Sequence, residues 1–288
     1  MAEPIFVTPD DNLQRVFDAA PEGSVIYLSA GIYRQKTVIR TPGLTIIGQG
    51  PDKTVLVFRD YARKRDPAGF AYLTFRSYTL AVCADGVTLR ELAVVNDALH
   101  PETLGQEVAL SVVADGFLME KCRLSSTQDT LFTGPLPPDL IERYTGFLPE
   151  ELRRGGEMRQ VFRSCLIEGT VDFIFGCGKS LFESCEIRSL PEVRGTGYAC
   201  APAHSQEQEQ GYLFQSCHFT CAQGVAPESV YLARPWRDYG LARFEGCVYG
   251  PHIHPLGFHK WEGTHRDETA RFSESPAVEG RAAWAGRL

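Results

Sequence analysis

The sequence predicts an all-β chain that coils as a parallel β-helix. Three observations favour this fold class: short apolar segments recur along the chain, turn-forming Gly, Asn and Asp residues separate them, and five segments end alike before a cysteine. Short β-rich units that recur in this way fit a coil in which each turn buries its inward side chains against the next. A β-sandwich whose strands resemble one another by chance is the competing fold.

Cysteine marks the recurring strand end. Its clearest copies read Phe-Arg-Ser-Cys, Phe-Glu-Ser-Cys and Phe-Gln-Ser-Cys, and the five cysteines are Cys122, Cys165, Cys185, Cys217 and Cys247. The last four are 20, 32 and 30 residues apart, as in coils with loops of variable length. We therefore expect an internal ladder of thiols. The nine cysteines include no Cys-x-x-Cys pair, which predicts reduced core thiols rather than disulfides or a zinc site.

Local patterns assign the first strands and both ends of the coil. Thr8-Pro9-Asp10-Asp11 offers an N-cap with Pro at the first helical position, and the apolar residues 13, 16, 17 and 20 follow at helical spacing, so we expect a capping helix here. Residues 25–28, 31–33, 44–48 and 55–58 read as successive strands. The polar, Ala-rich tail 267–288 is expected to pack as a terminal cap rather than as another coil.

Composition indicates a globular protein with a substantial core, because 43% of the 288 residues are hydrophobic and 23% are charged. We expect one domain over 1–288, acting as a monomer. A formal charge of −7 offers no long-range attraction to nucleic acid or an anionic membrane. The chain shows neither a secretory signal nor an apolar stretch of membrane-spanning length, so as written it is expected to be cytoplasmic, or secreted if a signal was removed.

Asp172 is the most unusual residue of the predicted strands. It lies within the apolar run GTVDFIFG at 169–176, whose other residues favour a buried strand. A lone strand aspartate more often faces solvent or meets a basic partner. Two other segments, QDTLF at 128–132 and YLARPW at 231–236, add a second carboxylate, an amide and a guanidinium. Together the three segments indicate a reactive site.

These motifs resemble those of the pectin methylesterase (pectinesterase) family. The similar segments are QDTLF, GTVDFIFG and LARPW, and 105–110 resembles a further family segment that supplies a glutamine. The similarity covers about 7–288 in the same order. It implies a right-handed parallel β-helix of the pectin lyase-like type, and a carbohydrate esterase that removes methyl esters from galacturonate units of pectin or oligogalacturonides. It also implies methanol as product, a part in pectin degradation or cell-wall modification, and no cofactor or metal.

The resemblance implies catalytic roles for five residues. Asp172 matches the family's nucleophile, Asp129 its general acid, and Arg234 the partner that keeps Asp172 ionised. Gln106 and Gln128 match the amide donors of an oxyanion hole. Ester hydrolysis needs these same groups: a nucleophile, a proton donor for the alcohol, a base for water and donors for the oxyanion. For each glutamine, a side chain that caps a turn of the coil is the alternative.

Aromatic side chains beside a polar site are expected to contact sugar rings, which present apolar C–H faces. The substrate-binding candidates are Trp236, Phe75, Phe132, Phe175 and Thr79; Phe75 and Thr79 come from a stretch similar to another substrate-contacting family segment. A role in the core is the default for any single Phe.

The long interval between Cys122 and Cys165 indicates an insertion at about 134–158, which is rich in Pro. One hypothesis is that it walls one end of the cleft, with Tyr144 and Phe147 as contacts, and favours short or end-bound galacturonate chains. A loop folded back as packing is the alternative.

Other functions stay open at this point. A galacturonan glycoside hydrolase also needs two carboxylates, and a β-helix can bind carbohydrate without catalysis. A related esterase or thioesterase could share the architecture. A metal-dependent pectate lyase would need several acids on adjacent coils, which the sequence does not offer.

Overall fold

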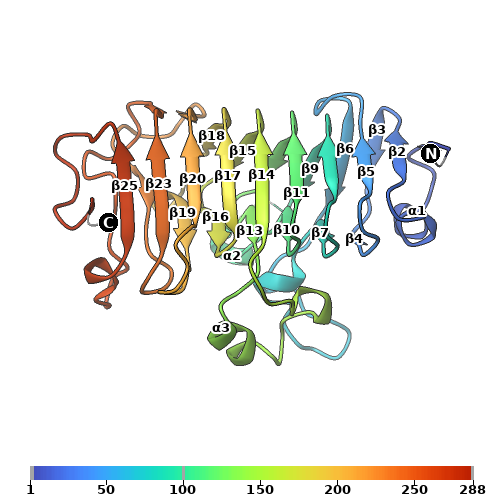
Figure 1. Cartoon of the computed structure of the whole chain (residues 1–288), viewed down its shortest axis with the longest axis horizontal. Coiled ribbons are helices and arrows are strands. Elements are labelled where there is room, and N and C mark those ends of the chain that lie inside the picture. The colour runs from blue at the N-terminus through green and yellow to red at the C-terminus, as the bar shows by residue number, and fades with distance from the viewer. Residues whose placement is uncertain (1–2, 99–100, 287–288) are drawn as a thin grey trace.

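The computed structural model describes residues 3–98 and 101–286. Within these ranges the chain winds into a right-handed parallel β-helix, which confirms the predicted fold class (Figure 1). Successive strands fall in turn on three sheets, so most turns of the coil add one strand to each sheet. Neighbouring strands within each sheet pair in parallel.

Sheet A has ten strands and sheet B has eight. Sheet A contains β1 (Ile5–Val7), β2 (Val25–Leu28), β5 (Thr45–Ile47), β8 (Thr88–Arg90), β11 (Phe117–Glu120), β14 (Arg159–Arg163), β17 (Lys179–Glu183), β20 (Tyr212–Gln215), β23 (Leu241–Glu245) and β25 (Arg271–Ser275). Sheet B contains β3 (Gly31–Tyr33), β6 (Thr54–Phe58), β9 (Ala93–Asn96), β12 (Arg123–Ser125), β15 (Leu166–Gly169), β18 (Glu186–Ser189), β21 (His218–Cys221) and β24 (Val248–Tyr249).

Sheet C has seven strands and carries the site described below. Its strands are β4 (Thr37–Ile39), β7 (Leu80–Val82), β10 (Leu110–Val112), β13 (Leu131–Thr133), β16 (Val171–Gly176), β19 (Gly197–Pro202) and β22 (Val230–Ala233). The helices are short: α1 (Leu13–Ala19), α2 (Pro101–Leu104), α3 (Pro138–Arg143) and the 3-10 turns η1 (Thr74–Arg76), η2 (Glu150–Leu152) and η3 (Arg266–Glu268).

The cysteine-marked strand end is the turn from sheet A to sheet B. The residue before each ladder cysteine has a positive φ: Lys121 53°, Ser164 51°, Ser184 52°, Ser216 53° and Gly246 60°. Behind these turns each thiol donates to a backbone carbonyl of the preceding coil: Cys165 to Met119 at 3.4 Å, Cys185 to Phe162 at 3.2 Å, Cys217 to Phe182 at 3.2 Å and Cys247 to Phe214 at 3.3 Å. All nine cysteines are free. The predicted ladder of reduced thiols is therefore confirmed.

The N-terminal capping helix is confirmed, but its predicted start is wrong. Asn12 is the N-cap, and its side chain accepts from the backbone N–H of Arg15 at 2.9 Å. Thr8 instead closes a turn, because its own N–H donates to the carboxylate of Asp11 at 2.8 Å. Asp11 is engaged by this turn, so α1 begins only at Leu13.

The C-terminal segment differs in part from its prediction. Residues 271–275 form β25, which pairs with β23 and extends sheet A, so the tail does add a strand. Only Phe272 is apolar within this strand, and a single apolar residue gave no alternation to detect. Beyond it, Trp284 packs against Phe258 and Phe272, as expected of a cap. Residues 287 and 288 of the expected cap lie outside the described residues.

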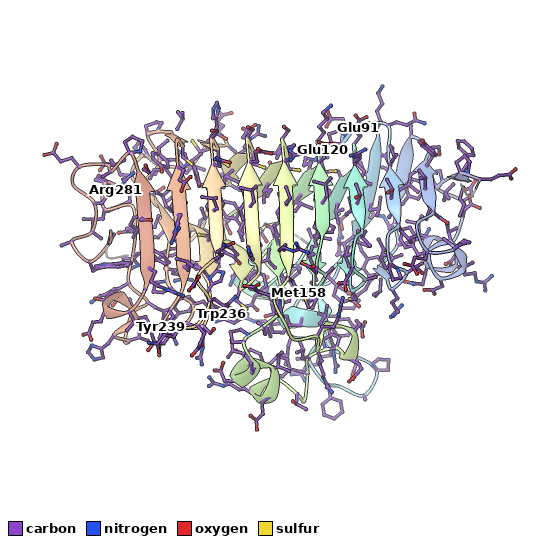
Figure 2. The ribbon with its side chains drawn as sticks, viewed as in Figure 1. Glu91, Glu120, Met158, Trp236, Tyr239 and Arg281 are labelled. Carbon is purple, nitrogen blue, oxygen red and sulfur yellow. The ribbon has the colours of Figure 1, made fainter. Side chains whose placement is uncertain are left out.

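Segment 134–158 projects from one edge of the β-helix and carries α3 and η2 (Figure 1). Met158, at the end of this segment, lies at the same edge as Trp236 (Figure 2). Over the described residues, no helix has the length and apolar character that crossing a membrane would require.

Candidate active site

The predicted catalytic residues converge on sheet C. Gln106 precedes β10, Gln128 and Asp129 precede β13, Asp172 lies in β16 and Arg234 follows β22. The strand order β22-β19-β16-β13-β10 brings these coils side by side, although up to 128 residues separate them in sequence. All five residues line one cavity of about 330 Å³.

A bulge in β16 turns Asp172 into this cavity. In a regular strand, Asp172 and Ile174 would point to the same side. Ile174 and Phe173 are instead both fully buried in the core of the coil, while Asp172 lines the cavity. The pairing with β19 shifts register between Val171 and Ile174, and Asp172 has a φ of 50°. The bulge thus breaks the alternation that would have buried the carboxylate.

Arg234 holds the Asp172 carboxylate in a two-pronged contact. Its Nε donates to Oδ1 at 2.8 Å and its Nη2 to Oδ2 at 2.6 Å. The guanidinium lies over the ring of Tyr198 at 3.9 Å and that of Trp261 at 4.3 Å from the centroids. Burial is the largest single influence and lowers the pKa of Arg234, but the charge and hydrogen bonds of Asp172, with smaller contributions from Tyr198 and Asp129, together outweigh it and the pKa is raised. Arg234 therefore stays charged and fixed in orientation.

Asp129 favours its protonated form. Burial, together with the negative charge of Asp172, raises the pKa of Asp129 well above its usual range, while Arg234 and a hydrogen bond from Gln128 act in the opposite direction. Asp129 also has a left-handed backbone, with φ at 65°. The site thus holds one carboxylate paired with a cation beside a second carboxyl group that favours its proton.

The Gln128 amide is oriented by Arg194. The Arg194 Nη2 donates to the Gln128 Oε1 at 3.3 Å, which leaves the amide nitrogen on the side of Asp129 and the cavity. Glu192 in turn holds Arg194 through contacts of 2.6 and 3.1 Å. Gln106 is half-buried and lines the same cavity from the neighbouring coil. Both glutamines therefore present amides to one space.

Three predicted substrate-contacting aromatics, Phe75, Phe175 and Trp236, line the cavity. Two predictions need correction. Phe132 is fully buried and does not line the cavity; it packs against Phe75 and Phe175, with ring centroids 5.1 and 5.2 Å away. Thr79 is also fully buried, and its hydroxyl donates to the carbonyl of Val95 at 2.9 Å. Phe132 supports the cavity wall from behind, and Thr79 anchors the coil.

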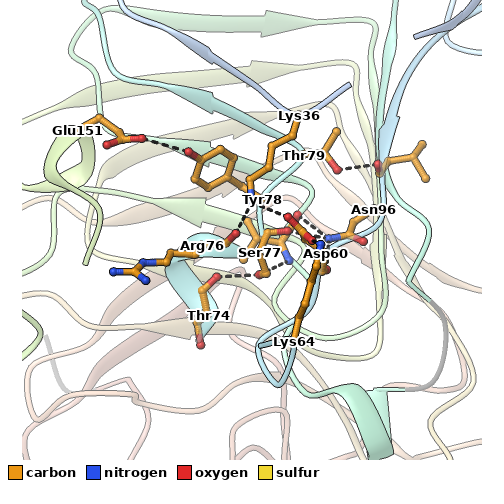
Figure 3. A network of polar contacts seen from close by, with 12 residues as sticks. Lys36, Asp60, Lys64, Thr74, Arg76, Ser77, Tyr78, Thr79, Asn96 and Glu151 are labelled. Carbon is orange, nitrogen blue, oxygen red and sulfur yellow. Dashed lines mark hydrogen bonds and ion pairs between the residues drawn. The ribbon is translucent and has the colours of Figure 1, made fainter. Parts of the chain in front are cut away.

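A buried polar network anchors the turn that carries Phe75 (Figure 3). The Asp60 carboxylate accepts from Lys36 at 2.6 Å and also from Lys64. Lys36 reaches a carbonyl of η1 as well. The Asn96 amide donates to the carbonyl of Asp60 at 2.8 Å. With Asp60 only 1% exposed, this network fixes η1 beside the cavity.

Sequence reasoning missed three residues of this site. Tyr198 and Trp261 sandwich Arg234, and Arg194 orients Gln128. An aromatic or an arginine outside a recognised motif gives no local signal, because these contacts join coils that are distant in sequence. Among residues 3–98 and 101–286, no cluster of three or more His, Cys, Asp or Glu side chains could hold a metal ion.

Fold and site together define a class: a β-helical protein with paired carboxyl groups, one bound to arginine, on its seven-stranded sheet. A family model described as Pectinesterase matches residues 5–135 and 155–287. The chain belongs to the pectinesterase family. The match leaves out 136–154, which lies within the predicted insertion.

Curated relatives and solved structures agree with this family. Pectinesterase 31 of Arabidopsis thaliana is 30% identical over 274 residues, covering 91% of this chain and 77% of that protein. Probable pectinesterase/pectinesterase inhibitor 16 of the same plant is 30% identical over 271 residues, covering 91% of this chain and 46% of that protein. The chain spans about half the length of several curated relatives that it matches. In fold it resembles pectin methylesterase from carrot, with a TM-score of 0.80 and 24% identity, covering 99% of this chain and 87% of that chain.

Proposed function

We propose that this protein is a pectin methylesterase, which hydrolyses methyl esters of galacturonate units in pectin or oligogalacturonides. The observation that carries the proposal is the arrangement of Asp172 and Asp129. One carboxylate is paired with an arginine through a two-pronged contact, and the other carboxyl group beside it favours its proton. This division of roles suits a nucleophile and a general acid.

In the first half of the reaction, an Asp172 oxygen attacks the ester carbonyl carbon. Each Asp172 oxygen accepts one N–H from Arg234 and keeps a second lone pair for this attack. The amides of Gln106 and Gln128 stabilise the negative oxygen that develops. The bond to the methoxy oxygen then breaks, Asp129 gives it a proton, and methanol leaves an anhydride on Asp172.

In the second half, water replaces methanol. Asp129, now ionised, takes a proton from the water that attacks the sugar's acyl carbon. The bond to Asp172 breaks, and its carboxylate returns to the contact with Arg234 while the free galacturonate departs. Asp129 regains its proton in this step and is ready for the next ester. The raised pKa of Asp129 supports both parts of this exchange.

The test is to incubate the protein with methylated oligogalacturonides and measure methanol and new reducing ends separately. An esterase releases methanol without reducing ends, whereas a glycoside hydrolase produces reducing ends. A carbohydrate-binding protein without activity gives neither, and hydrolysis only of acetyl esters or thioesters would identify the related esterase. The family match favours the first outcome over the others. Release of reducing ends without methanol would contradict the proposal.

Two further expectations stay predictions. A monomer is expected, and size-exclusion chromatography with light scattering would test it. The location, secreted or cytoplasmic, would be tested by fractionating cultures of cells that make the protein.

A further inference from the structure

Two chain segments, here called the two banks, flank the cleft over sheet C. All strands of this sheet run in the same direction, so one bank lies at their N-terminal ends and the other at their C-terminal ends. Residues 73–77, which include η1, precede β7 and approach from the N-terminal ends of the strands. Segment 134–158 follows β13 and approaches from the C-terminal ends. The two banks meet, since the ring of Phe75 lies 5.8 Å from that of Tyr144 and 6.3 Å from that of Phe147. The meeting point lies over β13 and β16, because the Phe75 ring is also 5.1 Å from that of Phe132 and 6.4 Å from that of Phe175.

The second bank is a packed structure. Leu140, Leu148 and Leu152 of segment 134–158 are at most 1% exposed and belong to the same apolar cluster as Phe75 and Phe132. Tyr144 and Phe147 face the cavity from this base, and their rings lie 4.8 Å apart. Segment 134–158 therefore packs its leucines against the coil and also lines the cavity with Tyr144 and Phe147. The sequence had offered packing and a cleft wall as separate alternatives.

Polar contacts fasten the segment to several coils. The Tyr78 hydroxyl, three residues after Phe75, donates to Glu151 at 3.1 Å (Figure 3). The Arg154 guanidinium donates to the carbonyls of Cys83 and Val113 at 2.8 and 3.0 Å. An ion pair between Asp139 and Arg237 ties α3 to the chain beyond β22. These contacts reach coils on both sides of β13 and β16 and hold the wall in place.

We propose that Phe75, Tyr144 and Phe147 close one end of the cleft beside the catalytic residues, so that the site takes the end of a methylated galacturonate chain or a short oligomer. The inference rests on the proposed esterase function. A long chain cannot pass this point, because the rings of the two banks are in contact and both banks are anchored. Aromatic faces at the closed end suit the C–H face of a terminal sugar ring. Residues 136–154 lie outside the family match, so this closure belongs to the chain's own insertion.

The test compares methylated oligogalacturonides with long, highly methylated pectin for the unmodified protein. We expect kcat/KM per ester to be about tenfold or more higher on the oligomers. Mass spectrometry of the earliest products should place the first free carboxylate at a chain end. Equal rates on both substrates, with free carboxylates at internal positions, would overturn the inference while leaving the esterase proposal intact. No methanol from any substrate would overturn both.

The double substitution Tyr144→Ala/Phe147→Ala opens the barrier. It should shift the ratio of kcat/KM between pectin and oligomer towards pectin by about tenfold. Phe70→Ala is the matched control, because Phe70 is 69% exposed and does not line the cavity. A folded double variant with the unmodified ratio would contradict the inference. If the double variant does not fold, product mapping on the unmodified protein still decides.

Discussion

Arg234 donates a hydrogen bond to each carboxylate oxygen of Asp172, at 2.8 and 2.6 Å, although 62 residues separate the two in sequence. The contact is flat and directional, because Tyr198 and Trp261 cover the two faces of the guanidinium. Its consequence is a carboxylate that is paired with a cation and held in one orientation within an apolar strand. Asp129, the neighbouring carboxyl group, has no two-pronged contact of this kind. Burial and the negative charge of Asp172 raise its pKa, so it favours its protonated form.

The substitution Asp172→Asn should abolish esterase activity. We expect methanol release to fall by about 10⁴-fold or more, because the nucleophile is lost while the side-chain shape is kept. Circular dichroism should show an intact fold. Asp52→Asn is the matched control, since its side chain is 88% exposed and its ion pair is with Arg123 at 3.4 Å, away from the cavity. Unreduced methanol release by Asp172→Asn would rule out the assigned nucleophile.

Activity should decrease towards alkaline pH because of Asp129. Only its protonated form can donate to the leaving methanol, so kcat should fall as pH rises through the raised pKa of this group. A pH profile of methanol release on a saturating oligomer measures this. A kcat that is constant up to strongly alkaline pH would contradict the assignment of Asp129 as the acid.

The same pKa shift makes a prediction for stability. The folded protein holds the Asp129 proton at pH values where the unfolded chain, with a pKa near 3.8, has lost it. The free energy of unfolding should therefore fall as pH rises from about 4 through the raised pKa. Asp129→Asn removes this dependence. The Tm of the variant minus that of the unmodified protein should grow over this range, and a constant difference in Tm would contradict the burial of a shifted carboxyl group.

Replacing Arg234 by lysine should reduce kcat more than it changes KM. Lysine keeps a positive charge but loses the two-pronged contact and the stacking between two rings. We expect kcat to fall by about 10²-fold, as for a displaced reacting group. Steady-state kinetics on one methylated oligomer separates the two constants. A loss that lies wholly in KM would show that Arg234 serves binding and not the orientation of Asp172.

Substitutions of Gln128 and of Arg194 should reduce esterase activity to different degrees. Gln128→Leu removes an oxyanion donor and should lower kcat by about 10²- to 10³-fold. Arg194→Met leaves the amide in place but frees its orientation, so a smaller loss is expected. If Gln128 only caps a turn of the coil, Gln128→Leu will lower the Tm and leave kcat unchanged.

A substitution at Gly176 tests how closely β16, the strand of the proposed nucleophile, packs against β13. It has a φ of +123°, and a Cβ there would lie 2.1 Å from the carbonyl oxygen of Thr133. Gly176→Ala should therefore lower the free energy of unfolding by more than about 1 kcal/mol in urea denaturation. Gly155→Ala is the control, because no atom lies within 4 Å of its Cβ position. Equal stability of the two variants would contradict this account of β16.

Several features of the molecule were readable from local sequence. Short apolar segments broken by turn residues predicted the first strands, and the Ser-Cys strand ends predicted the thiol ladder, because each coil repeats one local pattern. The motifs around Asp129, Asp172 and Arg234 indicated the carboxyl pair and its cation by resemblance. In α1 the helix was predicted but its N-cap was not, since Asp11 bonds to Thr8 in a turn that competes with capping.

Contacts between coils decided the rest, because neighbours across a β-helix are tens of residues apart in sequence. The direction in which Phe132 and Thr79 point, the sandwich of Tyr198 and Trp261 on Arg234, and the hold of Arg194 on Gln128 all depend on register between coils. Segment 134–158 has no repeat to predict its course. Its position follows from where its leucines find an apolar cluster, and that cluster exists only once the coils have stacked.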